Sequence, residues 1–256
     1  MSDKRSDCEP VPVLWTGGWD STFQVLRLLL EQHRAVLPIY LIKESRRSIR
    51  AELLAMKKIR GMLAAYDPKT KTLLRPLCLH TLTDIPENSA ITAAFKEVRA
   101  KKYIGQQYDW LARFCAWQHI PDLQLCIHKD DMAHAVLADL VVEDPPGSQT
   151  YRMSPMPQAT PEQLLFGPFT YPLFDFTKQA MARVAQQQGW HDIMMQTWFC
   201  HHPTKHGKPC GVCNPCQYTI AEGLGWRISP HRRYLGALHK TLMTYRQLFS
   251  KPKRSH

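Results

Sequence analysis

The segment Val11–Phe23, with the sequence VPVLWTGGWDSTF, constrains the fold of this chain more than any other segment. Its apolar run Val11–Trp15 is typical of a buried strand, and the apolar residues after it recur at the spacing of one helical face: Trp19, Phe23, Leu26 and Leu30. Two glycines between these runs allow a tight bend, in which backbone amides and the positive end of the helix dipole can approach an anion. The segment therefore predicts a strand, a phosphate-binding turn and a helix in direct succession.

The next residues along the chain continue this alternation of strand-like and helix-like runs. Strands are expected over residues 35–43, 76–82 and 123–128, and helices over residues 49–63, 91–117, 131–140 and 176–188. Such alternation predicts a parallel sheet with flanking helices and with ligands at the carboxyl ends of its strands. The stretch 143–172 contains seven prolines, and we interpret it either as a substrate lid that uses Arg152 or as a plain surface excursion.

The length and composition indicate a globular protein. A chain of 256 residues is long enough for one large α/β domain or two small ones. Hydrophobic residues make up 44% and charged residues 21%, which excludes a disordered chain and a coiled coil. No stretch is apolar enough to span a bilayer, and the first residues lack the apolar region of a secretory signal peptide. We therefore expect a cytoplasmic protein with no membrane partner.

Positive charge is concentrated near the C-terminal end. The net charge is +11, and Glu222 is the last acidic residue, followed only by basic ones: Arg227, Arg232, Arg233, Lys240, Arg246, Lys251, Lys253 and Arg254. This region predicts a surface that binds a polyanion or an acidic protein, or else an ordinary solvated helix face. Apolar residues recur there at helical spacing, and we expect their stripe to pack on the α/β body with the cations outward: Leu235, Leu238, Leu242, Tyr245 and Phe249.

Four of the eight cysteines fall within one short run, CHHPTKHGKPCGVCNPC, which begins at Cys200. A C-x-x-C turn presents two thiolates from one tight loop, and four thiolates complete a tetrahedral zinc ion without an open position. The run therefore predicts a structural zinc site, with an iron–sulfur cluster as the alternative, and with these ligands: Cys200, Cys210, Cys213 and Cys216. Three histidines of the loop could replace a cysteine, but with four thiols present we expect them to be solvated or to face a partner: His201, His202 and His206.

The glycine turn carries side chains suited to nucleotide chemistry. Its sequence TGGWDS, residues 16–21, is neither a Walker A loop nor a dinucleotide fingerprint. The hydroxyls of Thr16 and Ser21 can donate to phosphate oxygens, and the carboxylate of Asp20 can hold Mg²⁺. The alternative is that Asp20 and Ser21 merely cap the helix.

These motifs resemble those of a known family. The run TGGWDS is similar to the SGGxDS pyrophosphate loop of the ATP-pyrophosphatase (PP-loop) superfamily, with Thr16 in the place of the first serine. The cysteine run resembles the C-terminal zinc site of the 7-cyano-7-deazaguanine synthases within that superfamily. Phe176-Thr177-Lys178 stands where those enzymes carry a Thr-Lys pair before a helix. The motifs extend from Thr16 to Cys216, in the order expected for that family.

The resemblance implies an α/β fold in which a Rossmann-like parallel sheet with flanking helices is followed by a C-terminal zinc-binding subdomain. It implies a PP-loop ATP-binding domain over residues 1–195 and a zinc-binding, basic helical region over residues 196–256 packed on it. It also implies three cofactors, namely ATP, Mg²⁺ and Zn²⁺, and a catalytic role for Asp20, Ser21 and Lys178. The ATP-binding residues would be Thr16, Gly17, Gly18, Asp20 and Ser21. Without the resemblance, Lys178 would be interpreted as an ordinary surface lysine in the first turn of a helix.

The chain departs from the family at three motifs. Glu44–Ser48 stands in place of a Tyr-Gly-Gln-x-His run, and Gly105-Gln106-Gln107 stands in place of a Gly-Arg-Asn run. A third family motif, Tyr-Pro-Asp-Cys-Arg, has no counterpart after Lys129-Asp130-Asp131. Because these motifs handle the deazaguanine and ammonia in the family, the resemblance supports the use of ATP better than it supports a particular product.

Three hypotheses follow for the function. The first is an ATP-dependent ligase that adenylates a small 7-carboxy-7-deazaguanine-type substrate, releases AMP and pyrophosphate, and forms an amide or a nitrile. The second uses the same activation to attach a deazaguanine group to an amine of a protein or nucleic acid held at the basic C-terminus. The third is a catalytically silent nucleotide-binding adaptor, which the intact Asp20 and Lys178 disfavour. A homodimer is compatible with all three.

Overall fold

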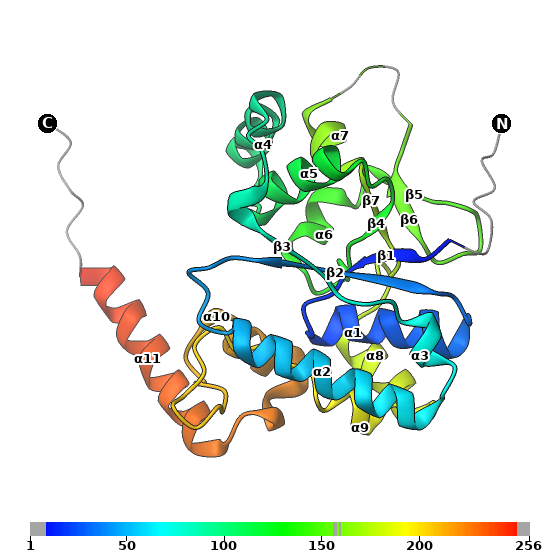
Figure 1. Cartoon of the computed structure of the whole chain (residues 1–256). Helices are drawn as coiled ribbons and strands as arrows, with labels where there is room; N and C mark the ends of the chain where they lie inside the picture. Colours follow the sequence, from blue (N-terminus) through cyan, green and yellow to red (C-terminus); the bar gives the residue numbers. More distant parts are fainter. Residues whose placement is uncertain (1–8, 156–157, 159, 250–256) are drawn as a thin grey trace, which may run out of the picture.

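A seven-stranded sheet in the order β3-β2-β1-β4-β7-β6-β5 separates two layers of helices (Figure 1). The computed structural model describes residues 9–155, 158 and 160–249. Five neighbouring strands are parallel, and β5 (Val141–Glu143) and β6 (Tyr151–Met153) extend one edge in antiparallel fashion. The parallel strands are β1 (Val11–Leu14), β2 (Val36–Ile42), β3 (Cys78–Thr81), β4 (Leu123–Gln124) and β7 (Phe169–Tyr171). The predicted α/β fold with a largely parallel sheet is confirmed.

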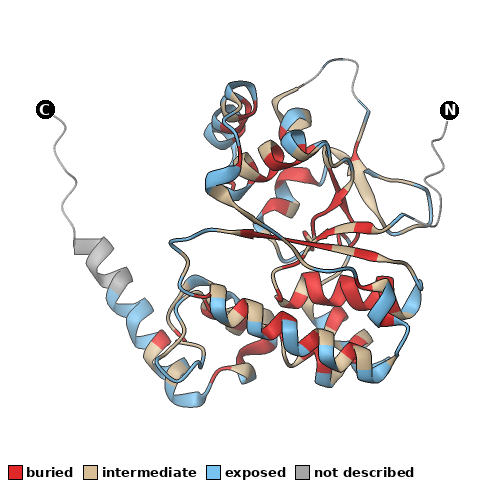
Figure 2. Ribbon diagram, in the orientation of Figure 1, coloured by how far each residue is buried: buried red, intermediate tan, exposed pale blue. Residues whose placement is uncertain are grey.

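The helices cover both faces of the sheet, and each layer buries its own apolar cluster (Figure 2). One layer contains α1 (Trp19–Leu26), α2 (Ile49–Tyr66), α3 (Thr70–Leu73), α8 (Lys178–Gln187) and α9 (His191–Met194). The other contains α4 (Ser89–Lys101), α5 (Gln107–Gln118), α6 (Met132–Leu137) and α7 (Pro161–Phe166). Large side chains such as Phe23 and Phe114 are fully buried, and each contributes roughly 1.5–3 kcal/mol to stability. None of the described helices is long and apolar enough to cross a membrane.

Two of the predicted elements are shorter than expected. The helix predicted over residues 91–117 is interrupted at residues 102–106, because Gly105 disfavours the helical conformation and Ile104 is instead buried as an anchor. The strand predicted over residues 123–128 ends at Gln124, where the chain turns and the N–H of Ile127 donates to the carbonyl of Leu125 at 2.8 Å. Both breaks lie at the carboxyl edge of the sheet, beside the glycine turn.

The proline-rich stretch 143–172 is neither a lid nor a plain surface excursion, so both interpretations of it are wrong for most of its length. It contains β6, α7 and the internal strand β7. Pro161 is compatible with α7 because it occupies the first helical turn, where its missing N–H costs nothing. Arg152 lies on β6, 2.7 Å from Asp144. It lines a cavity with Pro12 at the amino end of β1, away from the glycine turn.

The C-terminal region contains α10 (Asn214–Thr219) and α11 (Pro230–Phe249), and α11 projects from the body (Figure 1). The prediction that the leucine stripe of this helix packs on the body is wrong in its described part. Leu235 is half-buried, but Leu238 and Leu242 are 44% and 61% exposed. The contact is made instead by Gly236, whose backbone packs directly on Gly211. The side chains of residues 243–256, including the predicted stripe and basic residues beyond Leu242, lie outside those described.

Candidate functional site

The glycine turn connects the carboxyl end of β1 to the N-terminus of α1, as the sequence predicts. Gly17 has a φ of +67°, and a Cβ atom there would lie 3.0 Å from Cγ of Met56 and 3.1 Å from the carbonyl oxygen of Glu52. Only glycine fits this position without strain. Gly18 is the N-cap of α1 and no side chain caps this helix end, so neither Asp20 nor Ser21 acts as its cap. The first amides of α1 therefore remain available to an anion.

Lys178 is brought next to the turn from the start of α8. Its Nζ atom lies 3.7 Å from Oδ2 of Asp20 and donates to Oε2 of Glu222 at 2.7 Å. The side chain is 15% exposed, so it is not the surface lysine that the alternative interpretation describes. Burial opposes its charge, but the carboxylates of Asp20 and Glu222 outweigh this effect and raise the pKa of Lys178. Lys178 is therefore a cation at neutral pH.

One carboxylate oxygen of Asp20 has no hydrogen-bond donor among the described residues. Its Oδ1 atom is buried and, within the described part of the chain, accepts no hydrogen bond. The nearest basic group to this atom is Nε2 of the buried His128, at 3.6 Å. A buried carboxylate oxygen without a donor has lost its hydration, and a hard divalent cation such as Mg²⁺ would satisfy it. Ser21 is also buried, in the first turn of the same helix.

Two adjoining cavities meet at the glycine turn. One, of about 420 Å³, extends toward the C-terminal region and is lined by His128, Lys178 and Phe199 among others. The other, of about 720 Å³, extends over the ends of β1 and β2 and is lined by Leu14 and Leu41 among others. Several residues line both cavities: Thr16, Gly18, Asp20, Arg46, Tyr103, Ile104, Gly105, Gln107, Tyr108, Asp131 and His201. Volumes of this size hold small organic ligands, so the turn lies between two ligand-sized spaces.

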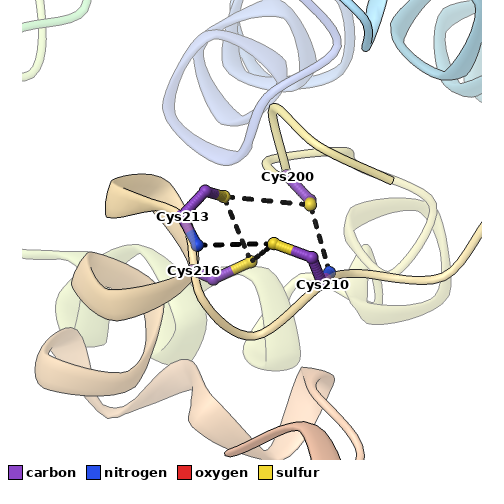
Figure 3. Close-up of side chains that lie close together, drawn as sticks. All are labelled: Cys200, Cys210, Cys213 and Cys216. Carbon is purple, nitrogen blue, oxygen red and sulfur yellow. Dashed lines mark hydrogen bonds between the residues drawn. The ribbon is translucent and has the colours of Figure 1, made fainter. Parts of the chain in front are cut away.

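The four predicted cysteine ligands converge on one point (Figure 3). Their sulfur atoms all lie within 4.8 Å of one another, and the separations are 3.9 Å for Cys200–Cys213, 3.9 Å for Cys210–Cys216 and 3.5 Å for Cys213–Cys216. A tetrahedral zinc ion with Zn–S bonds of about 2.3 Å requires sulfur separations of about 3.8 Å. The donor set therefore fits a single zinc ion, whereas a cluster of several irons would hold the sulfurs further apart.

Backbone amides support the thiolate form of this cluster. The N–H of Cys210 donates to Sγ of Cys200 at 3.2 Å, and the N–H groups of Val212 and Cys213 donate to Sγ of Cys210 at 3.4 and 3.3 Å. The contacts among the thiols lower the pKa of Cys213 and raise the pKa values of Cys200 and Cys216, so Cys213 ionises most readily of these three. Thiolates are the form that binds zinc. With four sulfur ligands and no open position, the cluster suits a structural ion.

Residues next to the cysteine cluster contact the glycine turn and the start of α1 directly. The N–H of Trp198 donates to the carbonyl oxygen of Gly17 at 2.8 Å. The guanidinium of Arg227 lies 5.0 Å from the ring centroid of Phe199 and 5.1 Å from that of Trp19, and burial lowers its pKa to about 10. Arg227 therefore joins the C-terminal region to α1 and does not belong to the basic surface that the charge distribution predicted.

Sequence reasoning missed several residues that line the cavities. His128 and Glu222 had detectable signals, because the first follows a strand-like run and the second is the last acidic residue of the chain. Arg46 lies in the Glu44–Ser48 run, which was noted only as a departure from a family motif. Tyr103 had no signal, since it lies in a loop whose position depends on long-range packing. His201, for which the sequence predicts a solvated or partner-facing side chain, is half-buried and lines both cavities.

These features define an α/β protein with a candidate phosphate-binding turn at the carboxyl edge of its sheet and a four-cysteine cluster beside it. The comparison with protein families found a match to part of the chain. The family model described as queuosine biosynthesis protein QueC matches residues 167–223, a segment that includes Lys178, the cysteine cluster and Glu222. The resemblance to the QueC family seen in the sequence is thereby confirmed over this segment, which does not include the glycine turn. The comparison with curated proteins found no match.

Proposed function

We propose that this protein is an ATP-dependent adenylating enzyme that acts on a 7-carboxy-7-deazaguanine-type acid and forms an amide or a nitrile. The observation that carries the proposal is the convergence of Gly18, Asp20 and Lys178 at one cavity, together with the QueC match around Lys178. The family match supports the class of reaction, and the geometry supports roles for these residues in binding pyrophosphate and Mg²⁺.

The proposed reaction has two steps. A carboxylate oxygen of the acid attacks the α-phosphorus of ATP, and the bond to the β-phosphate oxygen breaks, which releases pyrophosphate. The nitrogen of an amine then attacks the acyl carbon and loses a proton to solvent, and AMP leaves with the former carboxylate oxygen. A nitrile requires a second activation of the amide oxygen in the same manner. Charge develops on the departing pyrophosphate, so fixed donors next to it favour the transition state.

We assign the pyrophosphate to the N-terminus of α1. The amides of the uncapped first turn and the hydroxyls of Thr16 and Ser21 would donate to its oxygens, and Lys178 would neutralise part of its charge. Asp20, with its unpartnered Oδ1 atom, would hold Mg²⁺, which neutralises the phosphate charge when bound. The cavity over β1 and β2 suits the nucleoside because Leu14 and Leu41 give it an apolar wall. The cavity beside Phe199 is then left for the acid.

We further propose that Cys200, Cys210, Cys213 and Cys216 bind a structural zinc ion that fixes the wall of the acid cavity. Trp198 and Phe199 immediately precede the first ligand and line that cavity. The division of the chain into an ATP-binding domain over residues 1–195 and a zinc-binding region over residues 196–256 stays a prediction.

The test is product analysis by liquid chromatography and mass spectrometry. Purified protein is incubated with ATP, Mg²⁺, ammonia and 7-carboxy-7-deazaguanine, and we expect AMP, pyrophosphate and the amide or nitrile. Asp20→Ala should abolish turnover, since it removes the magnesium ligand, while the control Asp139→Ala, at an exposed position, should retain it. Formation of ADP and phosphate, or equal activity of the two variants, would contradict the proposal.

A second candidate function, transfer of the activated acyl group to a macromolecular amine, is favoured by α11. This helix projects from the body with exposed cations that include Arg233 and Lys240, which a free small-molecule substrate does not need. Fluorescence anisotropy with a labelled RNA oligonucleotide tests whether the acceptor is a nucleic acid. The double variant Arg233→Glu/Lys240→Glu should weaken binding and flatten its salt dependence by about one log–log unit for each phosphate that the variant no longer neutralises. Equal binding by variant and wild type would remove this support.

A further inference from the structure

The loop between β2 and α2 places a second cation, Arg46, beside the glycine turn. β2 is the neighbour of β1 on the side of the sheet opposite β4 and β7. Arg46 follows β2, whereas Lys178 follows β7, so the two cations reach the turn from opposite sides. Both line the smaller cavity, but Arg46 also lines the larger one and Lys178 does not. Arg46 therefore lies where the two ligand spaces meet.

Arg46 is held by a carboxylate that is already satisfied by other groups. Glu52 is 4% exposed, and it accepts hydrogen bonds from the hydroxyl of Tyr40 at 2.5 Å and from that of Ser48 at 2.6 Å. Nη1 of Arg46 lies 3.5 Å from both oxygens of the same carboxylate. These are long contacts, and they use one of the three guanidinium nitrogens. The strong partners of Glu52 are thus the two hydroxyls, and most of the donor capacity of Arg46 is left for another acceptor.

The surroundings fit an anionic acceptor. The Arg46 side chain is 29% exposed, and the next residue of the loop, Arg47, is exposed. A guanidinium presents its donors in a planar fork that matches the oxygens of phosphate and carboxylate groups. Around the same junction, the turn at Gly18 offers amides of α1 to an anion. In the proposed reaction the α-phosphate and the carboxylate of the acid must come together, and this junction is where the two cavities meet.

We propose that Arg46 binds an oxyanion at the junction of the two cavities and acts as a substrate-binding residue that the family resemblance did not assign. This inference rests on the proposed function and adds a named contact to it. The oxyanion is either the α-phosphate of the nucleotide or the carboxylate of the acid, because those groups meet during adenylation. Arg46 fixes that oxyanion from the β2 side, and Glu52 keeps the guanidinium in place.

Isothermal titration calorimetry of Arg46→Gln against the matched control Arg47→Gln tests this inference. Each protein is titrated with Mg²⁺-ATP and, separately, with 7-carboxy-7-deazaguanine. We expect Arg46→Gln to bind one of them about 10- to 100-fold more weakly than wild type, the range for loss of a hydrogen bond to a charged group. Arg47→Gln should match wild type. Weaker binding of ATP would show that Arg46 binds the α-phosphate, and weaker binding of the acid would show that it binds the carboxylate.

Two results would overturn the inference, and they separate it from the proposed function. If wild type binds both ligands and Arg46→Gln binds each within twofold of Arg47→Gln, Arg46 is only a surface cation and the proposed function stands. If wild type binds neither ligand, both proposals fail. Circular dichroism and thermal melting report whether Arg46→Gln is folded. If it is not, Arg46→Lys replaces it, and this variant should also weaken binding because an ammonium group lacks the planar fork.

Discussion

The contact between α11 and the cysteine cluster can be tested at Gly236. A Cβ atom at this position would overlap the carbonyl oxygen of Gly211 and would lie 2.7 Å from Nε2 of Gln217. Gln217 Nε2 donates to the same carbonyl oxygen at 2.7 Å. Gly211 lies within the C-G-V-C turn between two of the cysteine ligands. Gly236→Ala therefore pushes α11 away from the cluster and breaks the hydrogen bond of Gln217.

Two opposing effects set the size of the change. Alanine stabilises a helix by about 1 kcal/mol relative to glycine. Overpacking costs about 1–3 kcal/mol, and the upper end applies because the overlapped atom belongs to the backbone and cannot change rotamer. The broken hydrogen bond costs about 1 kcal/mol more. We expect Gly236→Ala to lower the free energy of unfolding by about 2–3 kcal/mol.

The control is Gly61→Ala in α2, where an added Cβ atom would meet no other atom within 4 Å. The same substitution should there raise the free energy of unfolding by up to about 1 kcal/mol. Urea unfolding followed by tryptophan fluorescence measures both variants, and a colorimetric chelator measures the rate of zinc release from each. Gly236→Ala should also release zinc faster. If Gly236→Ala were as stable as Gly61→Ala, the packing of α11 on the cluster described here would be wrong.

Two further predictions concern the metal and the pH dependence of stability. Purified protein should contain about one zinc ion per chain by plasma mass spectrometry. Cys213→Ser should lose most of the zinc and also be less stable, since metal binding and folding are coupled. A well-folded wild-type protein without metal would refute the zinc site. His134 stacks on Phe174 with ring centroids 4.2 Å apart, and burial, followed by the charge of Lys129, lowers its pKa. A lowered pKa means that the unfolded chain binds the proton more readily than the folded chain. The contribution of neutral His134 to stability is therefore complete above pH 6.5 and decreases as the pH drops below it. Melting temperatures from pH 7.5 to 5 should decline less for His134→Phe than for wild type, and parallel curves would contradict the assignment.

Features that depend on short stretches of sequence could be predicted. The strand, the glycine turn and α1 follow from periodicity and from two glycines within a single segment. The cysteine cluster follows because three of its ligands, Cys210, Cys213 and Cys216, lie within seven residues of one another and only Cys200 must be brought in. In both cases, local geometry limits the number of arrangements that the chain can adopt.

Features that depend on distant contacts could not be predicted in this way. The strand β7 is only three residues long and lies within the proline-rich stretch, and it is fixed by pairing with β4 in the sheet. The position of Arg46 depends on Glu52 in α2, which meets Tyr40 of β2 only when α2 packs on the sheet. The predicted orientation of α11 is wrong because its apolar stripe suggests a packed face, whereas the contact is made by the backbone of Gly236.

The most direct test of the proposed adenylation follows the oxygen atoms of the acid. 7-Carboxy-7-deazaguanine labelled with ¹⁸O in its carboxylate is incubated with the protein, ATP, Mg²⁺ and ammonia, and the AMP is analysed by mass spectrometry. If a carboxylate oxygen attacks the α-phosphorus, AMP gains one ¹⁸O atom and pyrophosphate gains none. AMP without the label, or label recovered in inorganic phosphate with formation of ADP, would contradict adenylation of the acid.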